Sequence, residues 1–334
     1  MTMREKRHSR NESSRGTALL LAVCCALLGI FLLLLYRSES GPDEAETSTS
    51  ADEEVIVVDG VEYVPKKNIK SYLFIGTDDK VEEGEGYVTG GQCDVLQVLV
   101  VDRSHRRYRR LSINRNTMMD VHSYDEDGED LGTTYCQIAL AHSSGDGGIT
   151  SCQYTIEAVS EYLHGVQFDY YARVGLNSLR DINHLLGGVS VTIEDDFSRS
   201  DPTLVQGETV LLSDEQAYHF LHDRTNVGDG SNEGRMRRQE AYLNSARGRV
   251  MELLKTDKNF PKTAFQTLNE IALTNMNEKE FGRLLNVASS YEAEENVEIT
   301  GTIGEDEFAF ATFESDPESV QDAVLALFYE RKDQ

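Results

Sequence analysis

The chain shows three patterns of hydrophobic and polar residues, and the first is a continuous apolar run near the N-terminus. Residues 16–36 carry no charge and are almost entirely apolar from Ala18 to Tyr36. A helix rises about 1.5 Å per residue, so this run would extend roughly 31 Å, the thickness of a bilayer core. The pattern therefore predicts a transmembrane helix over residues 16–36.

The charges on either side of this run predict its orientation. Five basic side chains precede it: Arg4, Lys6, Arg7, Arg10 and Arg15. The positive-inside rule places residues 1–15 in the cytoplasm and everything after Arg37 outside the cell. A cleaved signal peptide is the alternative, but its apolar region is normally shorter and is followed directly by an A-x-A site, which this chain lacks.

The second pattern is an acidic, polar stretch over residues 37–66. Nine Asp or Glu residues occur between positions 38 and 62, together with Ser, Thr, Gly and Pro. We interpret this composition as a solvated extracytoplasmic stalk. Apolar residues alternate over 55–58 and 61–64 around Asp59-Gly60, a dipeptide typical of a two-residue hairpin turn.

The third pattern is a series of short apolar runs that alternate with segments of helical periodicity. The runs predict strands over residues 71–75, 95–101, 109–113, 170–174 and 189–193. Amphipathic periodicity predicts helices over residues 157–163, 176–186, 213–222 and 234–254. Strands separated by helices indicate an α/β fold, which we expect as a layered αβα domain with a central mixed sheet over residues 67–255, preceded by one transmembrane helix.

Residues 256–334 are predicted to form a C-terminal α/β extension. Their pattern indicates two helices within 262–291, one or two strands within 297–313 and a helix within 316–329. Three aromatic residues of the strand region are candidates for burial: Phe308, Phe310 and Phe313.

Charge and cysteine content narrow the classes of protein that fit this sequence. The formal net charge is -26, which repels nucleic acid, so we expect no nucleic-acid partner. Cys93, Cys136 and Cys152 would face the oxidising side of the membrane, where a Cys136–Cys152 disulfide and free buried thiols both fit the sequence. Because no CxxC pair or His/Cys cluster has zinc spacing, we expect no structural zinc.

Polar residues that could bind a metal or take part in catalysis lie at the ends of the predicted strands. Asp78 comes directly after the first strand, and Asp94 precedes the second. Two carboxylates at one sheet edge suit a Mg²⁺ ion that also binds phosphate oxygens, although single aspartates are more often turn residues or caps. Arg115 ends the third strand, where α/β sheets usually carry functional groups, although most arginines only solubilise the surface.

The most specific stretch contains HFLHDR at 219–224 and GRMRRQ at 234–239, separated by a glycine-rich loop. Arg235 and Arg238 are three residues apart, so they share one face of a new helix. Backbone N–H groups and the helix dipole favour an anion there, and guanidinium forks suit a diphosphate. A solvated, salt-bridged helix start is the alternative, but so many arginines in so acidic a chain favour the anion site.

Five motifs follow one another behind the N-terminal anchor: GTDDK, a second Asp before a strand, SINRNT, HFLHDR and GRMRRQ. In these motifs and their order, the chain resembles the LytR–CpsA–Psr family over about residues 69–250. The resemblance implies a membrane enzyme that transfers a glycopolymer from a polyprenyl-pyrophosphate carrier to peptidoglycan, forms a phosphodiester and needs Mg²⁺ (or Mn²⁺). It implies that Asp78, Asp94 and Arg115 are catalytic and that Asp78 and Asp94 also hold the metal. The residues implied to bind the pyrophosphate are Arg115, Arg224, Arg235, Arg238 and Gln239. An apolar groove for the lipid, or ordinary core, is expected around residues 154–163, 176–186 and 189–193.

Three departures from the family pattern lie near this expected site. Gln92 and His222 stand where the family usually has arginine, and Asn116 stands where it usually has aspartate. A histidine is cationic only at lower pH, so up to two fixed positive charges are lost. A weakened or non-catalytic binder of lipid-linked precursors is therefore the alternative function, with a carrier pyrophosphatase as a further one. A transcription regulator fits poorly, since no basic recognition helix is evident, and a serine hydrolase lacks its GxSxG motif.

Overall fold

The computed structural model describes residues 55–78, 83–84, 87–88, 91–125, 127–223 and 226–332. The predicted transmembrane helix and cytoplasmic tail lie outside this set, as do most of the predicted stalk and Arg224. Within the described ranges, no helix combines the length and the apolar character needed to cross a membrane.

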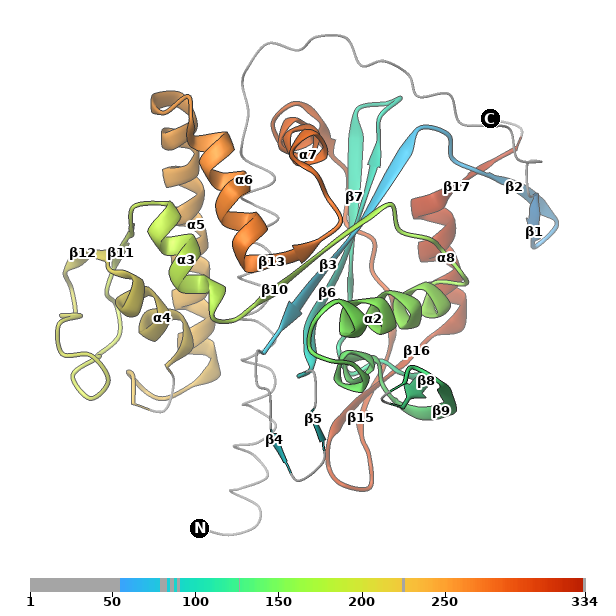
Figure 1. The fold of residues 1–334 in the computed structure, drawn as a ribbon, viewed down its shortest axis with the longest axis horizontal. Coiled ribbons are helices and arrows are strands. Elements are labelled where there is room, and N and C mark those ends of the chain that lie inside the picture. The colour runs from blue at the N-terminus through green and yellow to red at the C-terminus, as the bar shows by residue number, and fades with distance from the viewer. Residues whose placement is uncertain are drawn as a thin grey trace.

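A six-stranded mixed sheet forms the centre of the molecule, in the strand order β13–β10–β3–β6–β7–β14 (Figure 1). Its strands are β3 (Ile69–Thr77), β6 (Cys93–Asp102), β7 (Arg107–Ile113), β10 (Tyr170–Gly175), β13 (Ala272–Thr274) and β14 (Glu292–Ala293). β3 runs antiparallel to β6 and parallel to β10, which makes the sheet mixed. The predicted strands over 71–75, 95–101, 109–113 and 170–174 are confirmed.

Side chains that alternate along β3 pack into two separate cores. Tyr72 and Phe74 join the core on one face, and Leu73 and Ile75 join the core on the other. Because successive strand residues point to opposite faces, a strand covered on both sides consists of a continuous apolar run. This double burial is why the run around residues 71–75 predicts a strand without any polar alternation.

Helices cover both faces of the sheet and give the expected αβα layers (Figure 1). One layer contains α3 (Ser178–Leu185), α4 (Asp214–His222), α5 (Asn232–Thr256), α6 (Phe260–Ile271) and α7 (Glu278–Ser290). The other contains η1 (Ile138–Ser144), α2 (Ile149–Tyr162) and α8 (Pro317–Phe328). Since α2 and α3 lie in opposite layers, they do not line one shared apolar groove.

The predicted strand over 189–193 forms, but outside the central sheet. β11 (Val189–Thr192) pairs with β12 (Thr209–Leu212) in a separate two-stranded sheet. Gly188 precedes it with a φ of +89°, and a Cβ there would lie 2.9 Å from Leu211 Cδ1. The hairpin joins the core of one helical layer, with β11 beside α5.

The segment expected as a C-terminal extension contributes to the same sheet and to both of its covering layers. β13 and β14 are the two edge strands, α6 and α7 pack on one face, and α8 packs on the other. β17 (Tyr329–Arg331) pairs with β2 (Val61–Pro65), which forms the predicted hairpin with β1 (Ile56–Val58). Both turn residues, Asp59 and Gly60, have positive φ, as a tight hairpin turn requires.

Two more hairpins extend from the body of the molecule. They are β8 (Met118–Tyr124) with β9 (Asp130–Gln137), and β15 (Gly301–Glu305) with β16 (Ala311–Ser315); the two-residue strands β4 (Glu83–Gly84) and β5 (Tyr87–Val88) also pair. Phe313 is buried as predicted, but Phe308 and Phe310 are 73% and 55% exposed, so that part of the prediction is wrong. The Asp306 carboxylate accepts the backbone N–H of both residues, which closes the hairpin tip away from the core.

Candidate functional site

Three strand ends meet at one edge of the sheet and bring the predicted site residues together. Thr77 at the end of β3 pairs with Cys93 at the start of β6, and Ile113 at the end of β7 pairs with Leu96. Gly76 pairs with Val95, so Asp94 is the extra residue of a β-bulge. Bulges often redirect a side chain beside a functional site, and this one places Asp94 next to Arg115.

Four side chains at this edge form one hydrogen-bonded group, which we call the sheet-edge cluster: Asp78, Gln92, Asp94 and Arg115. Arg115 donates through Nη1 to the carboxylate of Asp94. Its Nη2 donates to Oε1 of Gln92 at 2.5 Å. The backbone N–H of Gln92 donates to Oδ1 of Asp78 at 3.2 Å. The structure therefore joins Asp78, Asp94 and Arg115, as expected, and adds Gln92 as the link between them.

The ion pair of the sheet-edge cluster is largely shielded from solvent. The side chains of Asp94 and Arg115 are 2% and 11% exposed. Burial lowers the pKa of Arg115, while the nearby Cys93 and Asp78 oppose that effect. An arginine stays charged in proteins, so this is a buried cation with a fixed partner. Within the described residues, its Nε has no hydrogen-bond acceptor.

The second predicted region, between α4 and α5, folds as its capping signals indicate. Ser213 and Gln216 form the capping box of α4, with the Gln216 N–H donating to Ser213 Oγ at 3.3 Å. Ser231 caps α5 by accepting the N–H of Gly234 at 3.0 Å. Arg235 and Arg238 then lie in the first turns of α5, and both are buried.

Arg238 and Gln239 close the C-terminal end of α4, and we call this group, with Asp195 and Asp223, the α4–α5 junction. Arg238 donates through Nε to Phe220 O at 2.9 Å, through Nη1 to Asp195 at 2.7 Å and through Nη2 to Asp223 O. Gln239 Nε2 donates to Leu221 O at 3.0 Å. Carbonyls in a last helical turn have no partner within the helix, so these side chains supply it.

Asp223 is held at this junction by three neighbouring side chains. Its carboxylate interacts with Nδ1 of His219 at 3.0 Å and Nδ1 of His222 at 3.4 Å, and it accepts a hydrogen bond from Ser200. Burial raises the pKa of Asp223, but the hydrogen bonds from His222, Ser200 and His219 outweigh it and bring the pKa to about 2. His222 also stacks on the ring of Tyr218, with centroids 5.0 Å apart.

The carboxylates of the sheet-edge cluster suit a magnesium site completed by a substrate. Within the residues that the structure describes, no three His, Cys, Asp or Glu side chains are arranged to hold a metal. Mg²⁺ is usually bound by one or two carboxylates together with phosphate oxygens and water. Asp78 and Asp94 would supply those two carboxylates, and a pyrophosphate would supply the rest.

The three cysteines of the folded region are free thiols. Burial raises the pKa of Cys93 to about 12, and its Sγ donates to Ala139 O at 3.4 Å. Burial also raises the pKa of Cys152 to about 11. Protonated buried thiols are poor nucleophiles and poor metal ligands, so Cys93 acts as packing beside Asp94.

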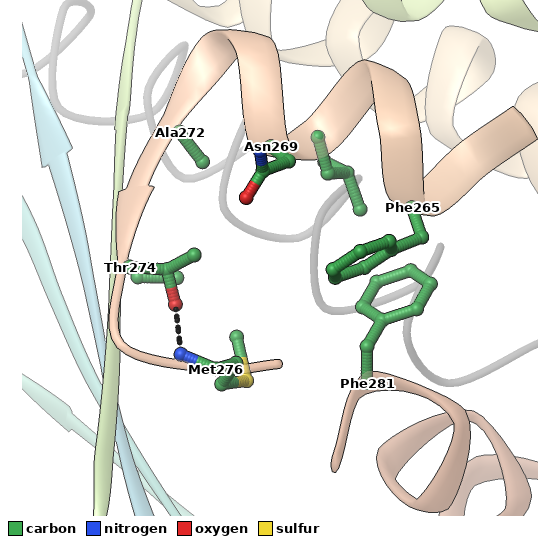
Figure 2. Close-up of a pocket in the computed structure, with 8 residues that line it drawn as sticks. Phe265, Asn269, Ala272, Thr274, Met276 and Phe281 are labelled. Carbon is green, nitrogen blue, oxygen red and sulfur yellow. Dashed lines mark hydrogen bonds between the residues drawn. The ribbon is translucent and has the colours of Figure 1, made fainter. Parts of the chain in front are cut away.

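An apolar pocket lies between α6, β13 and α7, and no residue of the sheet-edge cluster lines it (Figure 2). Phe265, Leu268, Met276 and Phe281 line it, together with Ala172 of β10. Its volume is about 20 Å³, which is room for roughly one water molecule. In this conformation the pocket is too small for a prenyl chain.

The fold and the sheet-edge cluster define an α/β protein in which an arginine fork and two carboxylates meet at one edge of a mixed sheet. The sequence model of the LytR_cpsA_psr family matches residues 32–324. The chain therefore belongs to the LytR–CpsA–Psr family, as its motifs predicted.

Curated relatives carry the name polyisoprenyl-teichoic acid–peptidoglycan teichoic acid transferase TagU. TagU of Bacillus subtilis (strain 168) is 25% identical over 241 residues, which cover 68% of this chain and 70% of the relative. TagU of Bacillus cereus (strain AH820) is 24% identical over 179 residues, covering 54% of this chain and 52% of the relative. The chain spans about half the length of several of the curated relatives that it matches.

Solved structures share the fold. TagV of B. subtilis aligns with a TM-score of 0.52 at 23% identity, covering 78% of this chain and 96% of the other. Protein gbs0355 from Streptococcus agalactiae aligns with a TM-score of 0.55 at 18% identity, covering 78% and 87%. These matches support the mixed α/β architecture.

Proposed function

We propose that this protein is a membrane-anchored phosphotransferase. It moves a glycopolymer phosphate from a polyprenyl-pyrophosphate carrier to peptidoglycan and forms a phosphodiester. The observation that carries the proposal is the buried guanidinium of Arg115, held between Asp94 and Gln92 beside Asp78. Membership of the family and the TagU relatives supports the substrate class. Residues 16–36 would anchor the chain, with the main domain outside the cell.

The chemistry needs positioning and charge neutralisation more than covalent catalysis. An acceptor hydroxyl attacks the phosphorus next to the sugar, the bond from that phosphorus to the bridging oxygen breaks, and the lipid phosphate leaves. Arg115 would neutralise the charge that builds up on the phosphate oxygens. The half-buried carboxylate of Asp78 would accept the proton of the attacking hydroxyl. Mg²⁺ (or Mn²⁺), when bound by Asp78 and Asp94, would supply further charge neutralisation.

Arg224, Arg235, Arg238 and Gln239 are proposed to bind the pyrophosphate from the helical side. Arg238 already donates three hydrogen bonds within the α4–α5 junction, so it would contribute mainly its charge.

The test is transfer of polymer from a polyprenyl-pyrophosphate donor to peptidoglycan fragments by the full-length protein with Mg²⁺. We expect turnover by the wild type and a loss of at least about a hundredfold in Arg115→Ala. Arg180→Ala, which removes a partly exposed arginine of α3, is the matched control and should retain activity. Tight carrier binding without turnover would show a non-catalytic binder instead, and release of free polymer would show a hydrolase.

A further inference from the structure

The loop that carries Arg115, residues 114–117 between β7 and β8, is held by backbone hydrogen bonds from two different parts of the chain. The carbonyls of Arg115 and Thr117 accept the N–H groups of Ala139 and Ile138, at 3.2 and 2.8 Å. The carbonyl of Asn116, between them, accepts the N–H of Phe313 in β16 at 2.8 Å. The start of η1 thus holds the loop from one side, and the C-terminal hairpin holds it from the other.

Gln137 is the side chain that connects these two supports. It is the last residue of β9 and is half-buried. Its Nε2 donates to Ala311 O of β16 at 2.6 Å and to Oδ1 of Asn116 in the loop at 3.4 Å. One amide group therefore contacts both the Arg115 loop and the C-terminal hairpin.

β16 is also anchored to other elements. Ser315 Oγ and the hydroxyl of Tyr162 in α2 share a hydrogen bond at 2.7 Å. The hydroxyl of Tyr135 in β9 donates to Glu314 at 2.6 Å. β16 is thus also fixed to α2 and β9, and the Tyr135–Glu314 bond does not involve the loop, so β16 can act as a support from which the loop is positioned.

We propose that Gln137 is a positioning residue for the transfer reaction, tying the Arg115 loop to the C-terminal β15–β16 hairpin and so setting where the Arg115 guanidinium lies. The inference rests on the proposed function. The fork of Arg115 is fixed by Asp94 and Gln92, and its backbone is fixed by the loop. A shift of about 1 Å in a catalytic group can cost a hundredfold in rate, so a loosened loop would slow the chemical step.

The decisive variant is Gln137→Leu, which keeps the approximate size of the side chain and removes its N–H donors. We expect kcat to fall by roughly tenfold to a hundredfold, with KM within about threefold of the wild type, because the carrier still binds but Arg115 is misplaced. Tyr135→Phe is the matched control: it removes another side-chain bond between β9 and the hairpin and touches no residue of the loop. It should leave kcat unchanged.

Hydrogen exchange followed by mass spectrometry gives a readout that does not depend on activity. The Phe313 amide should exchange faster in Gln137→Leu and at the wild-type rate in Tyr135→Phe. A normal kcat in Gln137→Leu, with or without faster exchange, would overturn the positioning role and leave the proposed function intact. Equal losses of kcat in both variants would show general damage to the hairpin and would also overturn it. A wild type without transfer would overturn the proposed function itself and, with it, this role of Gln137.

Discussion

The sheet-edge cluster and the α4–α5 junction are built from the same three kinds of side chain, yet they use them differently. At the sheet edge, Arg115 donates to side chains, the Asp94 carboxylate and the Gln92 amide oxygen. At the junction, Arg238 gives two of its three hydrogen bonds to main-chain carbonyls and one to Asp195.

This difference shows that Arg238 supports the end of α4 whether or not it also binds a ligand, whereas the hydrogen bonds of Arg115 go to side chains alone. Main-chain carbonyls at the end of α4 need a donor whenever the helix is formed, so Arg238 is committed to them. The partners of Arg115 are side-chain oxygens at strand ends, which no helix or sheet needs for its own backbone hydrogen bonds. Both arginines are largely buried, so we expect the kind of acceptor, rather than burial, to distinguish their roles.

The largest expected effect is the loss of stability in Arg238→Ala. The substitution leaves the mostly buried Asp195 carboxylate and the carbonyls of Phe220 and Asp223 without their donor. Removing one partner of a buried pair costs about 3–5 kcal/mol, so the free energy of unfolding measured with urea should fall by that amount. Arg237→Ala is the control, because Arg237 is 57% exposed and lies 3.8 Å from Asp195. A loss below about 1 kcal/mol in Arg238→Ala would contradict a structural role.

Asp94→Asn tests the sheet-edge cluster through the rate of polymer transfer. The substitution keeps the shape of the side chain but removes the charge that holds Arg115 and would help to bind Mg²⁺. We expect transfer to fall by about 10²–10³-fold, as for the loss of one preorganised group in an active site. The matched variant Asp195→Asn should lower stability more than it lowers the rate, when transfer assays and urea unfolding are compared. The reverse pattern would exchange the roles of the two clusters.

The pH dependence of stability probes the junction through Asp223. Its pKa in the folded protein is about 2, against an ordinary value of 3.8, which corresponds to roughly 2 kcal/mol. Because the folded pKa is the lower one, this stabilisation is complete above about pH 4 and is lost as the pH falls through 2. Asp223→Asn should therefore unfold more easily than the wild type at pH 7. In urea titrations from pH 7 down to 2, the difference in the free energy of unfolding between the wild type and Asp223→Asn should shrink only below pH 4. A difference that stays constant over this range would contradict the role of the Asp223 charge.

The central strands could be predicted from the sequence, whereas the order of strands in the sheet could not. β3 and β6 are buried on both faces, so their sequences are continuous apolar runs. The edge strands β13 and β14 have three and two residues, which is too short for any periodic signal. β8 and β9 were missed because β9 is largely exposed, so nothing in its sequence alternates between core and solvent.

The candidate site could also be predicted only as far as local sequence patterns reach. Asp78, Asp94 and Arg115 were predicted because each stands at the end of a strand. The bulge at Asp94 and the contact between Gln92 and Arg115 depend on the pairing of separate strands, which no local pattern encodes. Phosphate binding by Arg238 was predicted from its spacing and stays a prediction, whereas its hydrogen bonds to the end of α4 depend on tertiary packing that the spacing does not encode.

Arg180→Ala gives the smallest expected effect and tests whether burial decides how much an arginine ion pair contributes to stability, with Arg238 as the buried example. Arg180 makes two hydrogen bonds to Glu215, at 2.8 and 2.9 Å, and its guanidinium lies 3.8 Å from the ring centre of Tyr218. The geometry is as good as that of Arg238, but the Glu215 side chain is 67% exposed, so water solvates both charges. Exposed pairs contribute about 0–1 kcal/mol, and the change in urea unfolding should stay within that range and shrink further in high salt. A loss above about 2 kcal/mol would mean that bidentate geometry, rather than burial, sets the importance of an arginine in this protein.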